Sequence, residues 1–98
     1  MIYFRPSLDR ANYGGANLEG AFLKGADFNA ADLREANLKK AVLVRVDFST
    51  DVQLQRADLT DADLTGANLG NANLNGTIFC RTKMPNGSIR NDQCLSLK

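Results

Sequence analysis

The sequence predicts an all-β coil in which the chain turns a corner once in every five residues. Three observations lead to this fold class. A large apolar residue recurs at every fifth position, and a small residue, usually alanine, stands two positions before it. Asparagine or aspartate usually fills the position between the two. Internal repeats of this kind decide the architecture before any single residue is considered.

A five-residue period fits neither a helix nor a flat strand. In a helix five residues advance ~500°, which spreads the large residues around the axis. In a flat strand alternate residues face opposite sides, and because five is odd successive units would point apart. A chain that turns a corner in each unit buries both the small and the large residue around an inner axis. Successive layers of such a coil pair as parallel strands ~4.8 Å apart, which satisfies their main-chain groups.

The large apolar residues form two runs, and each run keeps its own register. The first run contains Leu8, Tyr13, Leu18, Leu23, Phe28, Leu33, Leu38, Leu43 and Phe48. The second contains Leu54, Leu59, Leu64, Leu69, Leu74 and Phe79. One extra residue separates the runs near Thr50 and Asp51, and we interpret it as a tolerated insertion that bulges outward at a corner. A displayed loop with a function is the alternative interpretation.

Glycine, asparagine and aspartate are expected to shape the corners. Several glycines follow the large residue, where a corner needs a permissive backbone. The asparagine and aspartate side chains before it can bond nearby backbone groups and support the turn. Five of these aspartates share one repeat position, so their recurrence is explained by the coil rather than by chemistry. They are Asp27, Asp32, Asp47, Asp58 and Asp63.

The repeated motif A-(N/D)-(L/F)-X-X resembles that of the pentapeptide-repeat proteins of the bacterial, and more narrowly the cyanobacterial, type. The resemblance covers roughly residues 6–81. It implies a right-handed quadrilateral parallel β-helix with four units per coil, and therefore about four coils here with capping segments. The clearest matches are Ala16-Asn17-Leu18, Ala31-Asp32-Leu33, Ala36-Asn37-Leu38, Ala57-Asp58-Leu59, Ala62-Asp63-Leu64, Ala67-Asn68-Leu69 and Ala72-Asn73-Leu74.

We predict one domain over residues 1–98. Residues 1–10 form an N-terminal lead-in or cap, and residues 11–81 carry the repeats. Residues 82–98 form a C-terminal cap, in which Pro85-Asn86-Gly87 predicts a turn. Met84, Ile89 and Leu95 are expected to pack onto the last coil, because the open ends of a repeat stack expose edges that must be covered.

The only two cysteines, Cys80 and Cys94, both lie near this C-terminal cap. A disulfide between them would close a loop and stabilise the fold by about 3 kcal/mol at most. In a reducing cytoplasm they would instead be free thiols. We expect a structural role in the cap, with or without the bond, in preference to a redox role.

The residue types exclude the common catalytic and metal chemistries. The chain has no histidine, so an imidazole base or a Ser-His-Asp arrangement is excluded. We find no phosphate-binding loop, dinucleotide fingerprint or zinc-ligand spacing. We therefore expect no enzyme activity, no catalytic residue, no cofactor and no metal.

Charge and hydropathy limit the kinds of partner and the cellular compartment that we expect. Twelve basic and eleven acidic residues give a net charge of +1, and without a basic run we expect no direct nucleic-acid partner. No stretch approaches the ~20 apolar residues of a membrane span. The first residues lack the apolar run of a secretory signal, which favours the cytoplasm. A periplasm or lumen stays an alternative.

One surface departs from the polar pattern. With four units per coil, Phe22 and Val42 stack on adjacent coils, and each replaces the usual asparagine or aspartate. Together with Val44 they predict an apolar interaction strip, with scattered surface hydrophobes as the alternative. The next side stacks Asp9, Asp27 and Asp47, which we interpret as a solvated ladder.

These observations favour a non-catalytic structural or protein-interaction role, with an unidentified protein partner and end-to-end or dimeric self-association. The resemblance supplies an alternative, because some pentapeptide-repeat proteins inhibit DNA gyrase as DNA-mimicking acidic rods. Balanced charge disfavours it, and so does a rod of only ~20 Å at ~4.8 Å per coil. The basic residues that interrupt the acids are Lys24, Arg34, Lys39, Lys40 and Arg45.

Overall fold

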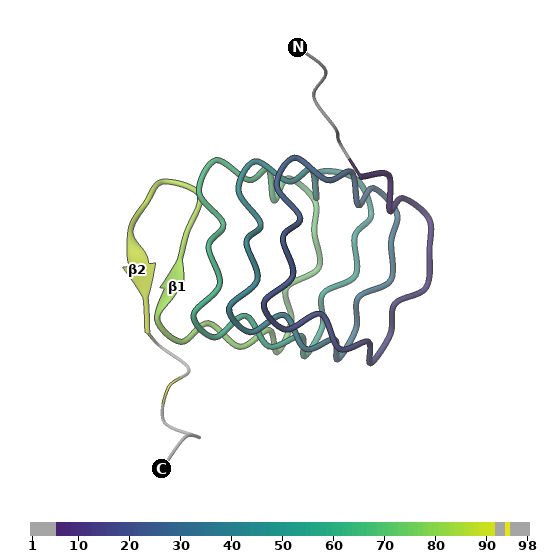
Figure 1. The fold of residues 1–98 in the computed structure, drawn as a ribbon. Helices are drawn as coiled ribbons and strands as arrows, with labels where there is room; N and C mark the ends of the chain where they lie inside the picture. Colours follow the sequence, from purple (N-terminus) through teal and green to yellow (C-terminus); the bar gives the residue numbers. More distant parts are fainter. Residues whose placement is uncertain (1–5, 92–93, 95–98) are drawn as a thin grey trace.

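The computed structural model of the protein describes residues 6–91 and residue 94. The chain winds into a stack of layers that lie side by side along one axis (Figure 1). Two short strands, β1 (Thr82–Lys83) and β2 (Ile89–Arg90), form an antiparallel pair at the C-terminal end of the stack. Residues 1–5 of the predicted N-terminal cap, and Leu95 of the C-terminal one, lie outside the described residues.

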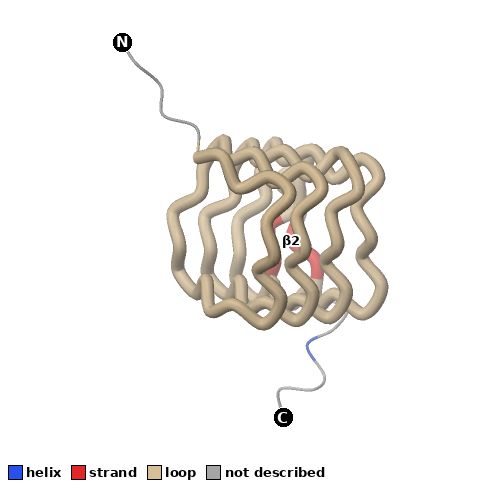
Figure 2. The backbone as a smooth tube through the Cα atoms, turned by 90° about the vertical axis from the view of Figure 1, so that its right-hand side faces the viewer, coloured by secondary structure: helices blue, strands red, loops and turns tan. Residues whose placement is uncertain are grey.

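The layers are joined by isolated parallel bridges, one for each five-residue unit. Ser7 bridges Asp27, twenty residues further on, and Asn12, Asn17 and Phe22 pair in the same way. A partner twenty residues away lies four units further along the chain. Each residue therefore rests on its equivalent in the next layer, as the tube in Figure 2 shows.

The bridges define four ladders, which run along four sides of the coil. We name each side by its first residue. The Ser7 side continues through Asp27, Asp47 and Asn68, and the Asn12 side through Asp32, Gln53 and Asn73. The Asn17 side continues through Asn37, Asp58 and Ile78, and the Phe22 side through Val42, Asp63 and Lys83.

The small and large repeat residues point inward and form one core. In the central layers these residues are almost fully buried. Phe28 and Phe48 stack at the core with their ring centroids 5.1 Å apart, and Tyr13 meets Phe28 edge-on at 6.5 Å. The predicted alternation of small and large inner residues therefore accounts for the core.

Most corners are held by the side chain before the large residue. The Asn12 side-chain oxygen accepts a hydrogen bond from the N–H of Gly14 at 2.9 Å, and Asp63 accepts one from the N–H of Thr65 at 2.9 Å. The same bond recurs along the chain, which confirms the predicted turn-supporting role of these residues. The last residue of most units has a positive φ, as in Gly15 at 70° and Arg56 at 61°.

The extra residue near Thr50 and Asp51 lies at the corner between the Ser7 and Asn12 sides. Bridges that cross this corner join residues twenty-one apart, such as Asp32 and Gln53, and later bridges return to twenty. Asp51 has a φ of 53°, and the N–H of Ala30 donates to the carbonyl of Thr50 at 2.7 Å. The ladder therefore continues on both sides of the insertion.

The C-terminal strands continue the coil and then fold back on it. Lys83 of β1 bridges Asp63 in the Phe22 side, and β2 pairs with β1 through Thr82 with Arg90 and Lys83 with Ile89. Met84 packs against the core as expected. The expectation for Ile89 was wrong, because its side chain is 56% exposed.

The reason lies in the alternation of side chains along β2. Neighbouring residues of a strand face opposite sides. Arg90 takes the inward direction, with its guanidinium carbon 4.2 Å from the centre of the Phe79 ring. A cation over an aromatic face is a favourable arrangement. Because Arg90 points inward, its neighbour Ile89 points to solvent.

Candidate functional site

The predicted apolar strip lies on the Phe22 side of the coil. Phe22 is 84% exposed, whereas Val42 and Val44 are half-buried. Phe22 bridges Val42 directly, and Val44 follows two residues later in the same unit. The structure therefore brings the three residues onto one side, with the phenyl ring as the most exposed part.

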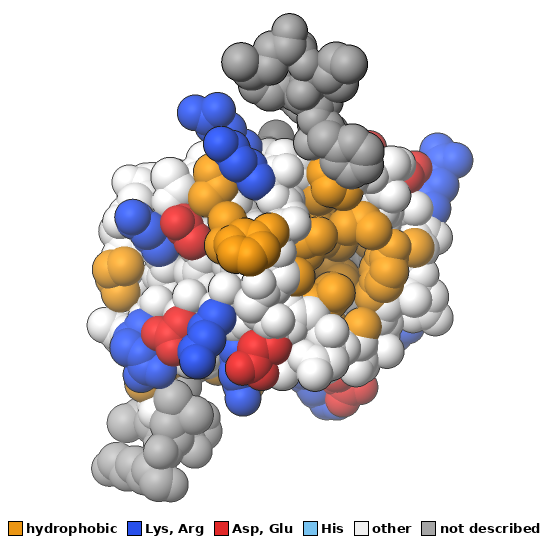
Figure 3. Space-filling model, in the orientation of Figure 1, with side chains coloured by type: hydrophobic (Ala, Val, Ile, Leu, Met, Phe, Trp, Pro, Cys, Tyr) orange, Lys and Arg blue, Asp and Glu red, His pale blue; other side chains and the backbone are white. Residues whose placement is uncertain are grey.

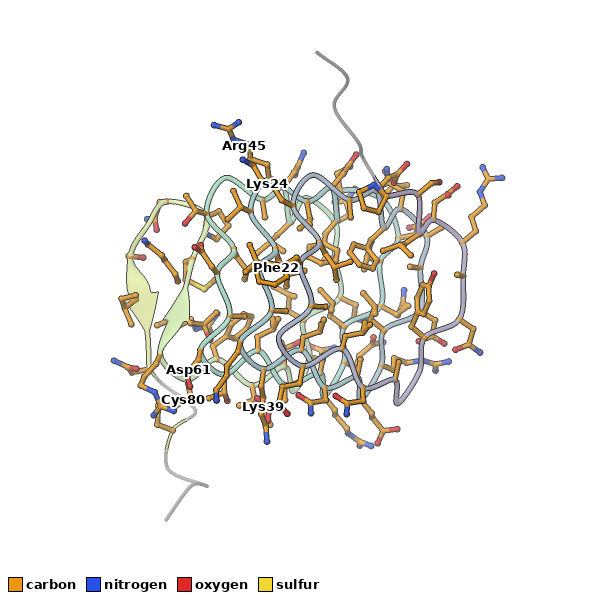
Figure 4. All side chains as sticks on the ribbon, viewed as in Figure 1. Phe22, Lys24, Lys39, Arg45, Asp61 and Cys80 are labelled. Atoms are coloured by element: carbon orange, nitrogen blue, oxygen red, sulfur yellow. A yellow bond between two sulfur atoms is a disulfide. The ribbon has the colours of Figure 1, made fainter. Side chains whose placement is uncertain are left out.

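Two basic side chains lie on one edge of the face that carries Phe22. Figure 4 shows Phe22 in the middle of this face, with Lys24 and Arg45 along one edge of it. Neither of these two cations forms an ion pair with any other described residue. The face therefore combines an exposed aromatic ring with two basic side chains that form no ion pair with a described residue.

Asp63 is the acidic residue of the Phe22 ladder, and its carboxylate is hydrogen-bonded within its own turn. Its carboxylate accepts hydrogen bonds from the hydroxyl and the backbone N–H of Thr65, at 2.6 and 2.9 Å. The hydroxyl, more than the N–H, holds the pKa of Asp63 below its usual value. The carboxylate thus stays ionised as part of the corner.

The predicted stack of Asp9, Asp27 and Asp47 was wrong for Asp9, because Ser7 is the residue that bridges Asp27. The other two acids are used by the turns. Asp27 accepts the N–H of Asn29, and Asp47 accepts both the hydroxyl and the N–H of Ser49. The Ser49 hydroxyl is the main reason why the pKa of Asp47 is lowered. The side-chain amide of Asn29 also donates to Asp47 at 3.0 Å and links the two layers. These contacts hold the coil together.

A shallow groove of about 850 Å³ lies on the Asn12 side, opposite the Phe22 side. Its floor is opened by Gly14, Gly15 and Gly76, which have no side chain to fill the space. Arg34 and Glu35 line it, but Arg34 pairs with Asp32 at 2.7 Å and Glu35 faces Arg56 at 4.0 Å.

The sequence reasoning missed this groove. The available signal was the run of two adjacent glycines in one unit, followed by a third glycine on the same side three layers later. The side-chain oxygen Oε1 of Gln55, which lines the groove, is buried and accepts no hydrogen bond. The charges of the groove largely neutralise one another.

The two cysteines meet at the C-terminal end of the stack. Cys80, fully buried, and Cys94 form a disulfide. The neighbouring Arg81 makes two contacts with the Asp61 carboxylate, at 2.8 and 3.1 Å. Its N–H also donates to the side chain of Asn91. Asn91 and Cys94, which follow β2, are thus each bonded to the last layer.

Among residues 6–91 and 94, no group of three or more His, Cys, Asp or Glu side chains is placed to hold a metal ion. In the same part of the chain, no helix has the length and apolarity needed to cross a membrane.

The profile of the pentapeptide-repeat family, described as pentapeptide repeats (8 copies), matches residues 14–49 and 50–87. No curated protein matches the chain. Among solved structures, a pentapeptide repeat protein from the thylakoid lumen of Arabidopsis thaliana is 32% identical. The match has a TM-score of 0.51 and covers 93% of this chain and 66% of that one.

Two cyanobacterial proteins are also similar. Rfr23 from Cyanothece 51142 is 21% identical with a TM-score of 0.55, and the match covers 86% of this chain and 84% of that one. HetL from Nostoc, a protein involved in heterocyst differentiation regulation, is 31% identical with a TM-score of 0.44. That match covers 88% of this chain and 48% of HetL, so the chain spans about half of HetL's length. With its repeat matched over most of its length and its layers stacked as a right-handed β-helix, the chain belongs to the pentapeptide-repeat protein family.

Proposed function

We propose that this protein is a non-catalytic interaction module that binds a protein partner through the Phe22 side. The observation that carries the proposal is the exposure of Phe22, 84%, at a repeat position that asparagine or aspartate fills in most units. A solvated coil gains nothing from an exposed phenyl ring, whereas a buried aromatic ring is a common anchor of protein interfaces.

The surroundings of Phe22 specify the kind of partner. Val42 and Val44 extend the apolar surface over the next layer, while Lys24 and Arg45 flank it with positive charge. The complementary surface is an apolar pocket or groove with an acidic rim, because opposite charges at the rim favour association. Uncompensated cations on this side do not favour the mimicry of DNA by an acidic rod.

The proposal extends to the finer architecture and the compartment. We infer about four coils with four sides, closed at the C-terminal end by residues 82–98, and the ladders and the β1–β2 pair support this. The Cys80–Cys94 disulfide favours an oxidising compartment such as a periplasm or lumen over the cytoplasm. Thiol trapping in the native host decides between them.

The experiment is affinity capture from the native host with matched baits. We expect Phe22→Ala and Val42→Asp to lose the protein that the wild-type bait retains. Asn17→Ala is the control, because Asn17 has the same repeat position and layer as Phe22 but lies on another side. Retention of the same protein by all four baits would exclude the Phe22 side as its binding surface.

A further inference from the structure

The Phe22 side carries a second exposed apolar residue, at its C-terminal end. Lys83 of β1 bridges Asp63 in the Phe22 ladder, and Ile89 of β2 is the partner of Lys83. Residues that face each other across an antiparallel pair project from the same face, so Ile89 adds a fifth rung to this side. Phe22 and Ile89 are the two large hydrophobic residues that stand exposed among residues 6–91 and 94, at 84% and 56%. Both therefore lie on the same side of the coil.

The five rungs form one column along the axis of the coil. Figure 3 shows hydrophobic side chains at the left of this face, where β2 lies in Figure 1, and in its middle, where Figure 4 labels Phe22. Neighbouring rungs of a sheet are ~4.8 Å apart, so Phe22 and Ile89, at the two ends of the column, lie ~19 Å from each other. The column belongs to the flank of the coil and consists of described residues.

The main chain of this column is already paired between the layers. The N–H of Val42 donates to the carbonyl of Ala21, and the carbonyl of Val42 accepts the N–H of Leu23. Asp63 forms the equivalent two bonds with Ala41 and Leu43. A partner on this flank therefore meets side chains, and it does not join the sheet as an added strand.

The charges on this side are mainly positive. Lys24, Arg45 and Lys83 are exposed, and none of the three forms an ion pair with a described residue. The repeat units of this side contain one carboxylate, that of Asp63, which is half-buried and hydrogen-bonded to Thr65. With three cations against one anion, the side favours an acidic partner, because complementary charges promote association.

The spacing of the rungs fits a helix better than an extended chain. A helix that lies along the coil advances ~5.4 Å per turn, so its successive turns meet successive rungs. In an extended chain, neighbouring side chains of one face are ~6.6 Å apart, which is further from the ~4.8 Å between rungs. About 13 residues of helix span the ~19 Å between Phe22 and Ile89.

We propose that the Phe22 side binds an acidic amphipathic helix of the partner protein, laid along the axis of the coil. The inference rests on the function proposed above and adds the conformation and charge of the partner. The apolar stripe of the helix covers Phe22 at one end and Ile89 at the other, and a groove between its rows of side chains receives the phenyl ring. Carboxylates beside the stripe meet the three cations. An apolar helix face laid on an apolar surface is a recurring mode of peptide recognition.

The test uses three synthetic peptides of about 18 residues, long enough as helices to cover the ~19 Å column. The first has a leucine stripe at helical spacing with glutamates beside it. The second has lysines in place of the glutamates, and the third is the first with a central proline, which breaks the helix. We expect the full chain to bind the first peptide about tenfold more tightly than either of the others, as measured by fluorescence anisotropy at low salt.

Variants of the protein locate the peptide on the column. We expect Ile89→Ala and Lys83→Glu each to weaken binding of the acidic peptide by about three- to tenfold, as Phe22→Ala does. Two controls are expected to bind it like the wild type. Ile78→Ala removes the same side chain from a bridge position of the Asn17 side, and Arg10→Glu makes the same charge change at the corner between the Ser7 and Asn12 sides. Circular dichroism checks that each variant keeps its fold.

Three results would overturn the inference. One is an acidic peptide that binds no more tightly than the other two, up to high micromolar protein. Another is full affinity of Ile89→Ala and Lys83→Glu for the acidic peptide while Phe22→Ala still loses the captured partner, which would keep the proposed function and remove the helix along the side. The last is binding to phosphatidylserine vesicles that Phe22→Ala and Ile89→Ala abolish, without binding of the acidic peptide. That result would make the side a membrane-binding surface and exclude the proposed function as well.

Discussion

At the scale of single residues, the type of amino acid at each repeat position depends on the direction in which its side chain points. Inward positions take alanine and leucine because the axis is narrow, and the position between them supplies an oxygen to the turn. Asp47 and Asp63 show the consequence, because their carboxylates bond the hydroxyl and N–H of the residue two positions later. Aspartates that repeat in this way are part of the coil.

These two carboxylates predict how stability depends on pH. Their pKa values are lowered from the ordinary value of 3.8 by the hydroxyls of Ser49 and Thr65. The stability that they contribute is therefore present above pH ~4 and is lost as the pH falls through their lowered pKa values. We expect the urea midpoint to be constant from pH 7 to 5 and to fall below about pH 4.

The matched variant is Asp47→Asn with Asp63→Asn. Asparagine keeps the turn acceptor, as Asn37 does at the same repeat position, but it does not titrate. We expect the double variant to lose less stability between pH 5 and pH 3 than the wild type does. Identical acid limbs for the two proteins would contradict this role of the carboxylates.

Gly70 gives a second prediction at this scale. A Cβ atom at Gly70 would lie 2.9 Å from the carbonyl oxygen and 3.1 Å from the Cα of Ser49, so the backbone beside the insertion would have to shift. We expect Gly70→Ala to lower the free energy of unfolding by about 1–3 kcal/mol.

Gly14→Ala is the control for this prediction. Gly14 has the same repeat position, but its added Cβ would meet the Asn12 side-chain oxygen at 3.2 Å, with the nearest backbone atom at 3.7 Å. A side chain can move aside, so the expected effect on the urea midpoint is small. Equal losses in the two variants would show that the contact with Ser49 is not the cause.

At the scale of elements, the repeat predicts the layers but not the end of the chain. The Pro85-Asn86-Gly87 signal was correct, since Met84 and Ser88 close this turn with a 2.7 Å hydrogen bond. The prediction that the side chain of Ile89 in β2 packs inward was wrong. Outside the repeat, hydropathy alone does not decide which face of a two-residue strand turns inward, and here the Arg90–Phe79 contact decides it.

The Cys80–Cys94 disulfide gives the prediction for the C-terminal element. The bond joins residues 14 apart in sequence, and a loop of that size contributes about 3 kcal/mol at most through the unfolded state. We expect reductant to lower the urea midpoint of the wild type and to leave Cys94→Ser unchanged. A wild type with the same midpoint in both conditions, despite a change of two mass units on reduction, would contradict this contribution.

At the scale of the whole molecule, counting in units of five predicted which side chains share a side. Phe22 and Val42 were placed together in this way, and the bridge between them agrees. The groove on the Asn12 side was not foreseen, because it arises where Gly14, Gly15 and Gly76 contribute no side chain in separate layers.

The central functional claim is that the protein binds a partner through the surface of its coil, on the Phe22 side. The most direct measurement is photo-crosslinking of the captured partner from probes placed one at a time at Lys24 and Val44, and at Arg34 and Gln55 on the opposite side. We expect crosslinks from the first pair and none from the second. Crosslinks from Arg34 and Gln55 alone would place the partner in the groove and contradict the account.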